Sequence, residues 1–398
     1  MVEYSDERLA DYQSDGRVRR AAPDVPFALL TLLLLTIGVI MVLSASFARA
    51  YYDPNTSSAL TYFTRQLFFA VTGVGIMAVA SLFPIGFYRK MSAPILLFAI
   101  VLLLLVAFAG REANGARRWF EIGPVTFQPS EIAKIAVILF DALLVCRYQG
   151  KMSTFRYGVV PFGLVAAVIV GLLALEPHFS AAIIIVVVTA VMMYAGGTRL
   201  GWFVLGGVGV GGLGAMVLTG IGYTSDRISA WLHPFEDTSD TGYQIVQSLY
   251  AIGSGGLSGL GLGQSRQKYL YLPEEHNDFI FSVICEELGF IGAILILLLF
   301  ALLISRGYWL ALHCRDRYSF LVCTGITSLL ALQVILNVSV VTNLVPCTGI
   351  SLPFFSYGGT ALWMQLAEMG IILSISRDIP EKKSVSAPRS AEPQEQGA

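Results

Sequence analysis

The chain has 398 residues, of which 55% are hydrophobic and 13% are charged, with a formal net charge of −1. So little charge excludes a soluble globular protein and predicts that lipid surrounds most of the chain. The near-neutral balance gives no indication of a nucleic-acid partner. Five cysteines, without any CxxC pair, fall mostly in or beside apolar runs, which favours small buried side chains over a disulfide or metal role.

Apolar runs long enough to span a membrane follow one another along the chain. A hydrocarbon core of ~30 Å needs about 20 helical residues, and an open sheet edge in lipid would leave backbone groups unpaired. The sequence therefore predicts an all-α polytopic membrane protein with about ten transmembrane helices. The expected spans are 26–46, 64–83, 93–110, 130–147, 157–175, 179–195, 200–219, 278–304, 319–341 and 356–376.

The distribution of Lys and Arg predicts the orientation. With the N-terminus in the cytoplasm, the inner segments carry roughly twice as many of these residues as the outer ones, so both termini are expected inside. The polar tails, 1–25 and 378–398, are expected to be disordered cytoplasmic segments that flank one transmembrane domain, 26–377. The segment 220–277, between the seventh and eighth spans, is expected to be a large extracytoplasmic loop, and a loop that long is usually functional.

Three charged residues lie in the fourth span. At ~100° per residue, Glu131, Lys134 and Asp141 fall within an arc of roughly 80°. Charge inside a membrane is costly, so this stripe should face protein or a water-filled cavity. One interpretation is a structural ion pair between Glu131 and Lys134. The other is a polar cavity open to the outer face, in which Lys134 meets an anionic group.

Asp278 stands where the long outer loop enters the eighth span. Partial desolvation at this boundary would raise the pKa of its carboxyl group toward the range useful for a general base. Alternatively, Asp278 is the N-cap of the helix that follows, and spacing alone does not separate the two. Glu286 and Glu287, two turns further, are expected to face the protein interior.

The glycine-rich run 253–263 admits two interpretations. Its backbone N–H groups could cradle a phosphate, but no strand–turn–helix context surrounds it, so tight turning near the membrane is favoured. The four histidines are scattered without the spacing of a zinc site, and no Ser-His-Asp constellation is indicated. They are His178, His233, His276 and His313.

Several motifs, in order and at matching depth, resemble the SEDS family (shape, elongation, division and sporulation proteins). The resemblance covers about 26–377. The motifs are NGARRW (114–119), QPSEIAK (128–134), GYQ (242–244) with IGSGG (252–256), LPE (272–274) with HNDFIF (276–281) and EELG (286–289), and GISLPFFSYGG (349–359). The last stretch, with Val341, Thr342 and Asn343 before it, is more similar to the FtsW and SpoVE branch than to the RodA branch.

The resemblance implies a ten-helix fold and a peptidoglycan glycosyltransferase that acts on lipid II. The family's essential loop aspartate maps onto Asp278, and its cavity glutamate and lysine map onto Glu131 and Lys134. Where many members have Pro-Asp after the fifth span, this chain has Pro177 and His178, so the role of that aspartate is not carried over.

The implied reaction transfers a growing glycan from undecaprenyl pyrophosphate onto the 4-hydroxyl group of a second lipid II, with inversion, at the outer face of a bacterial cytoplasmic membrane. Asp278 is the expected base. Positive charge must stabilise the departing pyrophosphate, with a divalent cation such as Mg²⁺ or Mn²⁺ as a possible aid. The expected substrate-binding residues are Lys134, Glu131, Arg117, Arg118, Arg266, Lys268 and Gln244.

The family works with a class B penicillin-binding protein and other division proteins, so such partners are expected. Two other functions fit part of the sequence. A lipid II flippase would also have spans and an outer vestibule, but the residues capable of chemistry gather toward one face and no repeat is visible. A scaffold that only recruits a transpeptidase leaves Glu131, Lys134 and Asp141 unexplained.

Overall fold

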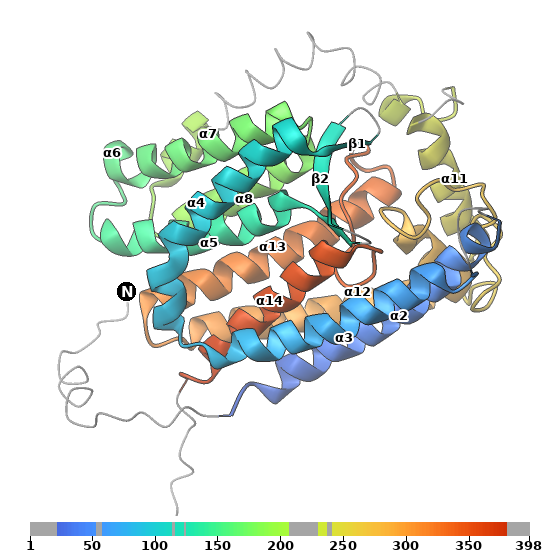
Figure 1. The fold of residues 1–398 in the computed structure, drawn as a ribbon, viewed down its shortest axis with the longest axis horizontal. Helices are drawn as coiled ribbons and strands as arrows, with labels where there is room; N and C mark the ends of the chain where they lie inside the picture. Colours follow the sequence, from blue (N-terminus) through green and yellow to red (C-terminus); the bar gives the residue numbers. More distant parts are fainter. Residues whose placement is uncertain are drawn as a thin grey trace, which may run out of the picture.

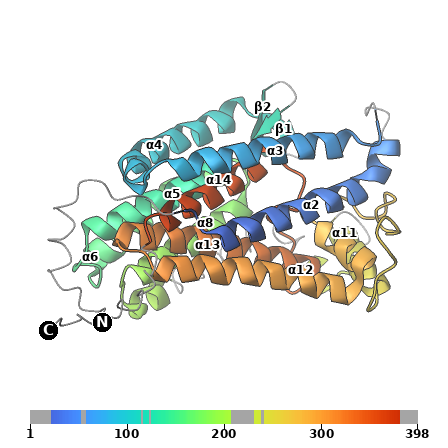
Figure 2. The same cartoon turned by 90° about the horizontal axis from the view of Figure 1, so that it is seen from below.

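The computed structural model describes residues 22–52, 58–113, 116–122, 125–206, 230–236 and 241–379. Most of them form a bundle of helices that run along the long axis of the molecule (Figures 1 and 2). The helices are α2 (Val25–Tyr52), α3 (Thr61–Leu82), α4 (Ile85–Ala109), α5 (Pro129–Arg147), α6 (Phe155–Gly158), α7 (Val160–Leu175), α8 (Phe179–Ala195), α11 (Thr241–Ser254), α12 (Ile280–Leu312), α13 (Arg317–Val341) and α14 (Gly359–Ser376). A small antiparallel sheet has the order β1 (Arg111–Ala113), β2 (Ala116–Ile122), β3 (Val125–Phe127).

The all-α membrane fold is confirmed. Six segments are long and apolar enough to cross a membrane, and α8 is a shorter apolar helix. Every expected span except 200–219 coincides with a helix of the bundle. Of that span, 200–206 is helical and the remainder lies outside the described residues, so the count of ten stays a prediction. The expected tails also lie almost wholly outside them.

Several expected boundaries are wrong. Helix α2 extends past 46 to Tyr52. Helix α4 begins at Ile85 rather than at 93. Pro94 therefore lies inside the helix instead of at its start, which membrane helices tolerate. Helix α12 extends past 304 to Leu312. Helix α14 begins at Gly359 rather than at 356, since the hydroxyl group of Ser356 bonds to the backbone of a turn. Part of the expected outer loop is helical, namely α11.

Small residues let α3 and α14 pack closely. A Cβ atom added to Gly73 would lie 2.5 Å from Leu366 Cδ1, and one added to Gly370 would lie 2.5 Å from the carbonyl oxygen of Met77. Membrane helices associate through such close van der Waals packing because lipid removes the hydrophobic driving force between them.

Helix α12 is broken at Gly289, and the glycine-rich run fills the break. Gly289 has a φ of 68°, which interrupts the helical hydrogen bonds. The N–H groups of Leu260 and Gly261 donate to the carbonyl groups of Glu286 and Glu287, both at 3.0 Å. Non-helical backbone in a membrane protein is tolerated where protein satisfies its polar groups. The favoured interpretation of this run, tight turning, is therefore confirmed.

The two ends of the bundle differ. The sheet and α11 lie toward one end and α6 lies at the other (Figures 1 and 2). Arg306 in α12 pairs with Asp24, just before α2, with Nε 3.1 Å from Oδ1. The N–H group of Asp24 donates to the hydroxyl group of Ser376 at the end of α14 (3.0 Å). The first and last described segments thus meet at the same end of the bundle.

Candidate active site

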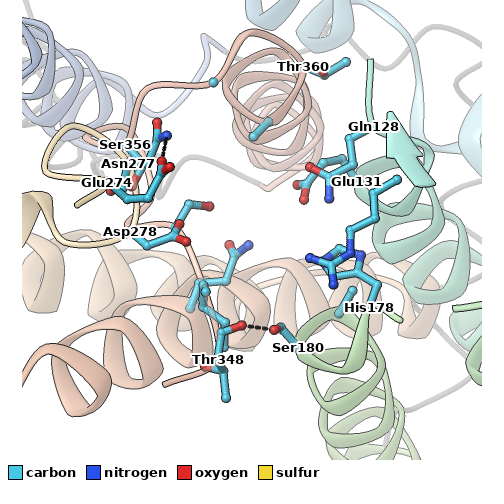
Figure 3. A pocket seen from close by; sticks show the side chains of 18 of the residues that line it. Gln128, Glu131, His178, Ser180, Glu274, Asn277, Asp278, Thr348, Ser356 and Thr360 are labelled. Atoms are coloured by element: carbon cyan, nitrogen blue, oxygen red, sulfur yellow. Dashed lines mark hydrogen bonds between the residues drawn. The ribbon is translucent and has the colours of Figure 1, made fainter. Parts of the chain in front are cut away.

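A polar cavity of about 550 Å³ lies at the end of the bundle that carries the sheet. Its walls come from β2, the start of α5, the turn between α7 and α8, and the segments before α12 and α14. Figure 3 looks into it. The cavity brings together five of the predicted site residues, which are Asp278, Glu131, Lys134, Arg118 and Gln244.

The wall formed by α5 carries an ion pair. Pro129 in the first turn of α5 starts the helix, so Glu131 and Lys134 lie one turn apart at the cavity. Lys134 Nζ lies 2.7 Å from Glu131 Oε2, and only 5% and 8% of the two residues are exposed. The two side chains thus form the expected ion pair, and the pair lines a polar cavity. That the cavity opens to the outer face and that Lys134 meets an anionic group there stay predictions.

Asp141 does not share that cavity. It is fully buried in α5 and is not one of the residues that line the cavity. Asp141 follows Lys134 by seven residues and so lies about 10 Å further along the helix axis. Residues on one face of a helix can therefore lie at different depths in the bundle. Asp141 is therefore surrounded by protein, one of the two environments expected for this stripe of charges.

Asp278 faces the cavity from the opposite wall. In Figure 3 it lies across the open space from Glu131 and His178. Helix α12 begins at Ile280, and its N-cap residue is Phe279, which makes no side-chain capping bond. Asp278 is thus not the N-cap, and the alternative that assigned it a capping role is wrong.

The backbone around Asp278 is fixed by two neighbouring segments. Asn337 Nδ2, on α13, donates to the carbonyl oxygen of Asp278 (2.8 Å) and to that of Ile350 (2.7 Å). Gly349 packs beside the carboxylate, since a Cβ atom there would lie 3.2 Å from Asp278 Oδ2, and its φ of 67° favours glycine. Asn337 was missed by sequence analysis; its only signal is an amide side chain in a mostly apolar run, which Gln333 shares.

The segment before α14 also holds the loop that contains Asp278. The hydroxyl group of Ser356 donates to the carbonyl group of Asn277 (2.8 Å), and the N–H group of Tyr357 donates to the carbonyl group of His276 (2.8 Å). The GISLPFFSYGG motif therefore acts as a clamp on the HNDFIF motif, although about 70 residues separate them in the chain.

The turn between α7 and α8 contributes His178. Arg118 on β2 holds this turn: its Nε donates to the carbonyl oxygen of Glu176 (3.2 Å) and its Nη2 to that of Pro177. His178 lines the cavity with 9% of its surface exposed. Burial first, and then the charges of Arg118 and Lys134, together lower the pKa of His178 to about 3. The imidazole is therefore neutral.

Three predicted substrate-binding cations do not reach the cavity. Lys268 is buried, with Nζ 2.8 Å from Glu287 Oε1 and 3.3 Å from the hydroxyl group of Ser44. Arg266 is exposed, and its N–H group donates to Glu286 (3.0 Å). Arg117 is exposed on β2. Lys268 is kept away from the cavity by electrostatic attraction, because a buried lysine beside a carboxylate stays paired with it.

Glu286 and Glu287 are buried, as predicted, and the five cysteines are free. No group of three or more His, Cys, Asp or Glu side chains able to hold a metal ion occurs among the described residues. The described residues therefore offer no dedicated site of this kind for a divalent cation.

Comparison with known proteins identifies the family. The sequence pattern of the FtsW, RodA and SpoVE family of cell cycle proteins matches residues 25–380. The chain belongs to this family. It is 42% identical to stage V sporulation protein E of Bacillus subtilis over 365 residues, which cover 90% of this chain and 98% of that protein. It is 38% identical to the probable peptidoglycan glycosyltransferase FtsW of Coxiella burnetii, covering 89% of this chain and 96% of the relative.

Solved structures agree with this membership of the FtsW, RodA and SpoVE family. A chain of a peptidoglycan synthase complex that coordinates polymerization and crosslinking superposes with a TM-score of 0.75, at 29% identity, covering 90% of this chain and 98% of that one. The rod shape determining protein RodA of Thermus thermophilus gives a TM-score of 0.67 at 28% identity, with coverage of 90% and 98%.

Proposed function

We propose that this protein is a peptidoglycan glycosyltransferase that polymerises lipid II, in division or sporulation. One observation carries the proposal: a carboxylate, Asp278, and a buried cation, Lys134, line one polar cavity. In Figure 3, Asp278 lies across the open space from Glu131, the ion-pair partner of Lys134. Polymerisation needs such a pair, because one group must remove a proton from the acceptor while another stabilises the charge of the leaving group. The FtsW relatives carry the activity in their names.

In the proposed reaction, the 4-hydroxyl oxygen of one lipid II forms a bond to the anomeric carbon of the lipid-linked glycan. The bond from that carbon to the pyrophosphate breaks, and the proton of the hydroxyl group passes to Asp278. Negative charge builds on the pyrophosphate, and fixed cations are worth most where they meet that developing charge. Lys134 and Arg118 line the same cavity, which supports this role for them. Attack in line inverts the anomeric centre.

The cavity would open to the outer face of the bacterial cytoplasmic membrane. The excess of Lys and Arg in the segments assigned to the inside supports this orientation. A class B penicillin-binding protein is the proposed partner, since a similar fold occurs in a synthase complex that couples polymerization to crosslinking. Glu131 and Gln244 would contribute to lipid II binding, because both line the same cavity.

The variant Asp278→Asn tests the proposal. General-base catalysis typically contributes about 10²–10⁴-fold, so polymerisation of purified lipid II, followed on gels, should fall by that factor while the protein folds normally. Asp316→Asn makes the same chemical change at the N-cap of α13, where Asn caps as well as Asp, and should leave the rate unchanged. Full glycan synthesis by Asp278→Asn would overturn the assignment.

A further inference from the structure

One of the buried polar atoms at the cavity belongs to a titratable side chain to which the proposed reaction gives no role. His178 Nδ1 has no hydrogen-bond partner among the described residues, and the residue is 9% exposed. His178 precedes α8 as its N-cap residue, yet it makes no side-chain capping bond. A buried polar group without a partner is costly, and such a group in a native cavity calls for an explanation.

The surroundings of this imidazole are cationic. Arg118 and Lys134 both act on it strongly enough to disfavour its protonation. Lys134 is already paired with Glu131. Glu176, in the same turn, is 1% exposed, and burial raises its pKa to about 8, with Arg118 opposing the shift. The other charged groups at the cavity are Arg111 on β1, and Glu274 and Asp278 on the opposite wall.

An anion bound beside His178, Arg118 and Lys134 would favour the protonated form of the imidazole. Burial is the main reason that His178 carries no proton, and repulsion by Arg118 and Lys134 adds to it. Two negative charges placed near Arg118 and Lys134 would cancel that repulsion and would also stabilise a charged imidazole in its buried position. The same anion would supply the acceptor that Nδ1 lacks. A diphosphate fits this requirement, because it has several acceptor oxygens spread over a span that more than one donor can reach.

We propose that His178 binds the diphosphate of the lipid-linked donor beside Arg118 and Lys134, and that the imidazole takes up a proton as the diphosphate binds. This inference rests on the proposed function and adds a third nitrogen ligand and a pH dependence to the same site. Binding coupled to proton uptake becomes tighter as the pH falls. If His178 only filled space, it would add no pH dependence to binding.

The test uses the full-length protein in detergent and a short-chain lipid II analogue, whose diphosphate is esterified on both phosphates and keeps its charge near neutrality. If the bound imidazole regains an ordinary pKa of about 6.5, the affinity should rise about eightfold between pH 7 and pH 5.5. In the variant His178→Asn, which keeps a hydrogen-bonding group but does not titrate, the affinity should change less than about twofold over this range.

Two controls separate other sources of a pH effect. His313→Asn, at the opposite end of α12 from Asp278, should retain the wild-type dependence. Glu176→Gln should also retain it, because the pKa of Glu176, about 8, lies above the window. A second measurement needs no variant: calorimetry of the wild type in buffers of different ionisation enthalpy should show nearly one proton taken up at pH 5.5 and about a quarter at pH 7.

Each outcome decides something different. If His178→Asn keeps the wild-type dependence, or the wild type takes up no proton, the role of His178 is overturned while the proposed function stands. If the wild type does not bind the analogue at all, the proposed function itself fails. His178→Gln repeats the test with a longer amide, and thermal unfolding verifies that each variant is folded.

Discussion

Lys268 Nζ lies 2.8 Å from Glu287 Oε1, and the two side chains are 3% and 0% exposed. The pair joins the loop before α12 to the helix itself, and Ser44 of α2 donates to the same carboxylate. We therefore expect Lys268→Met to lower the free energy of unfolding by about 3–5 kcal/mol, since it leaves a buried charge without its partner.

The activity of the folded Lys268→Met protein should stay near that of the wild type, because Lys268 does not line the cavity. Thermal unfolding and lipid II polymerisation, measured on the same preparations, would verify both parts. An increased KM for lipid II in a variant of unchanged stability would return Lys268 to the substrate site.

Variants of Glu131 and Lys134 can separate the contribution of the ion pair to stability from its contribution to catalysis. Lys134→Met should lower polymerisation by about 10²–10³-fold, as expected on loss of one charge that stabilises a leaving group. It should also destabilise the protein by roughly 3 kcal/mol, because Glu131 would be left unpaired in a buried position. The double variant with Glu131→Gln should regain stability without regaining activity. If the double variant regained activity, the pair would contribute only to stability and not to catalysis.

The break in α12 depends on two glycines in contact. A Cβ atom at Gly289 would lie 2.2 Å from the backbone nitrogen of Gly259. Gly289→Ala should therefore be strongly destabilising: the positive φ alone costs about 1–2 kcal/mol, and the overlap with backbone adds to it. The matched control is Gly253→Ala in α11, where a Cβ atom meets nothing within 4 Å. That variant should be as stable as the wild type or slightly more so. The yield of monodisperse protein and its unfolding temperature are the measurements.

Glu176 predicts a pH dependence of stability. Burial raises its pKa to about 8 from an ordinary value of 4.5, partly opposed by Arg118. The folded state then keeps a proton that the unfolded state has lost, so stability falls as the pH rises from about 4.5 to 8. Glu176→Gln removes this loss. The difference in unfolding temperature between the variant and the wild type should increase from pH 5 to pH 8.

A pH-independent difference would show that Glu176 is ionised when the protein is folded. Glu236→Gln provides the control, because that carboxylate is exposed and its removal should give no such trend.

Much of the fold could be predicted from the sequence because a span is a local property. The apolar runs placed helices at nearly every expected position, and Pro129 and Glu131 marked the start of α5 correctly. Boundaries were less accurate where a tertiary contact decides them. The turn before α14 exists because Ser356 bonds to Leu352 and Asn277, and residue spacing does not reveal those partners.

Some features of the candidate site could likewise be predicted from the sequence, and others could not. The position of Asp278 just before α12, and the one-turn spacing of Glu131 and Lys134, follow from the order of residues along single segments. Hydrophobicity and helical periodicity act within a segment, so sequence alone determined these features.

Only the tertiary structure decided which cations share a cavity with Asp278. Arg118 reaches it, whereas Lys268, much nearer to Asp278 in the chain, is held by Glu287. His178 also joins the cavity from a distant turn. Convergence of this kind depends on how helices pack and on which buried charge finds which partner, and neither is written in any one stretch of residues.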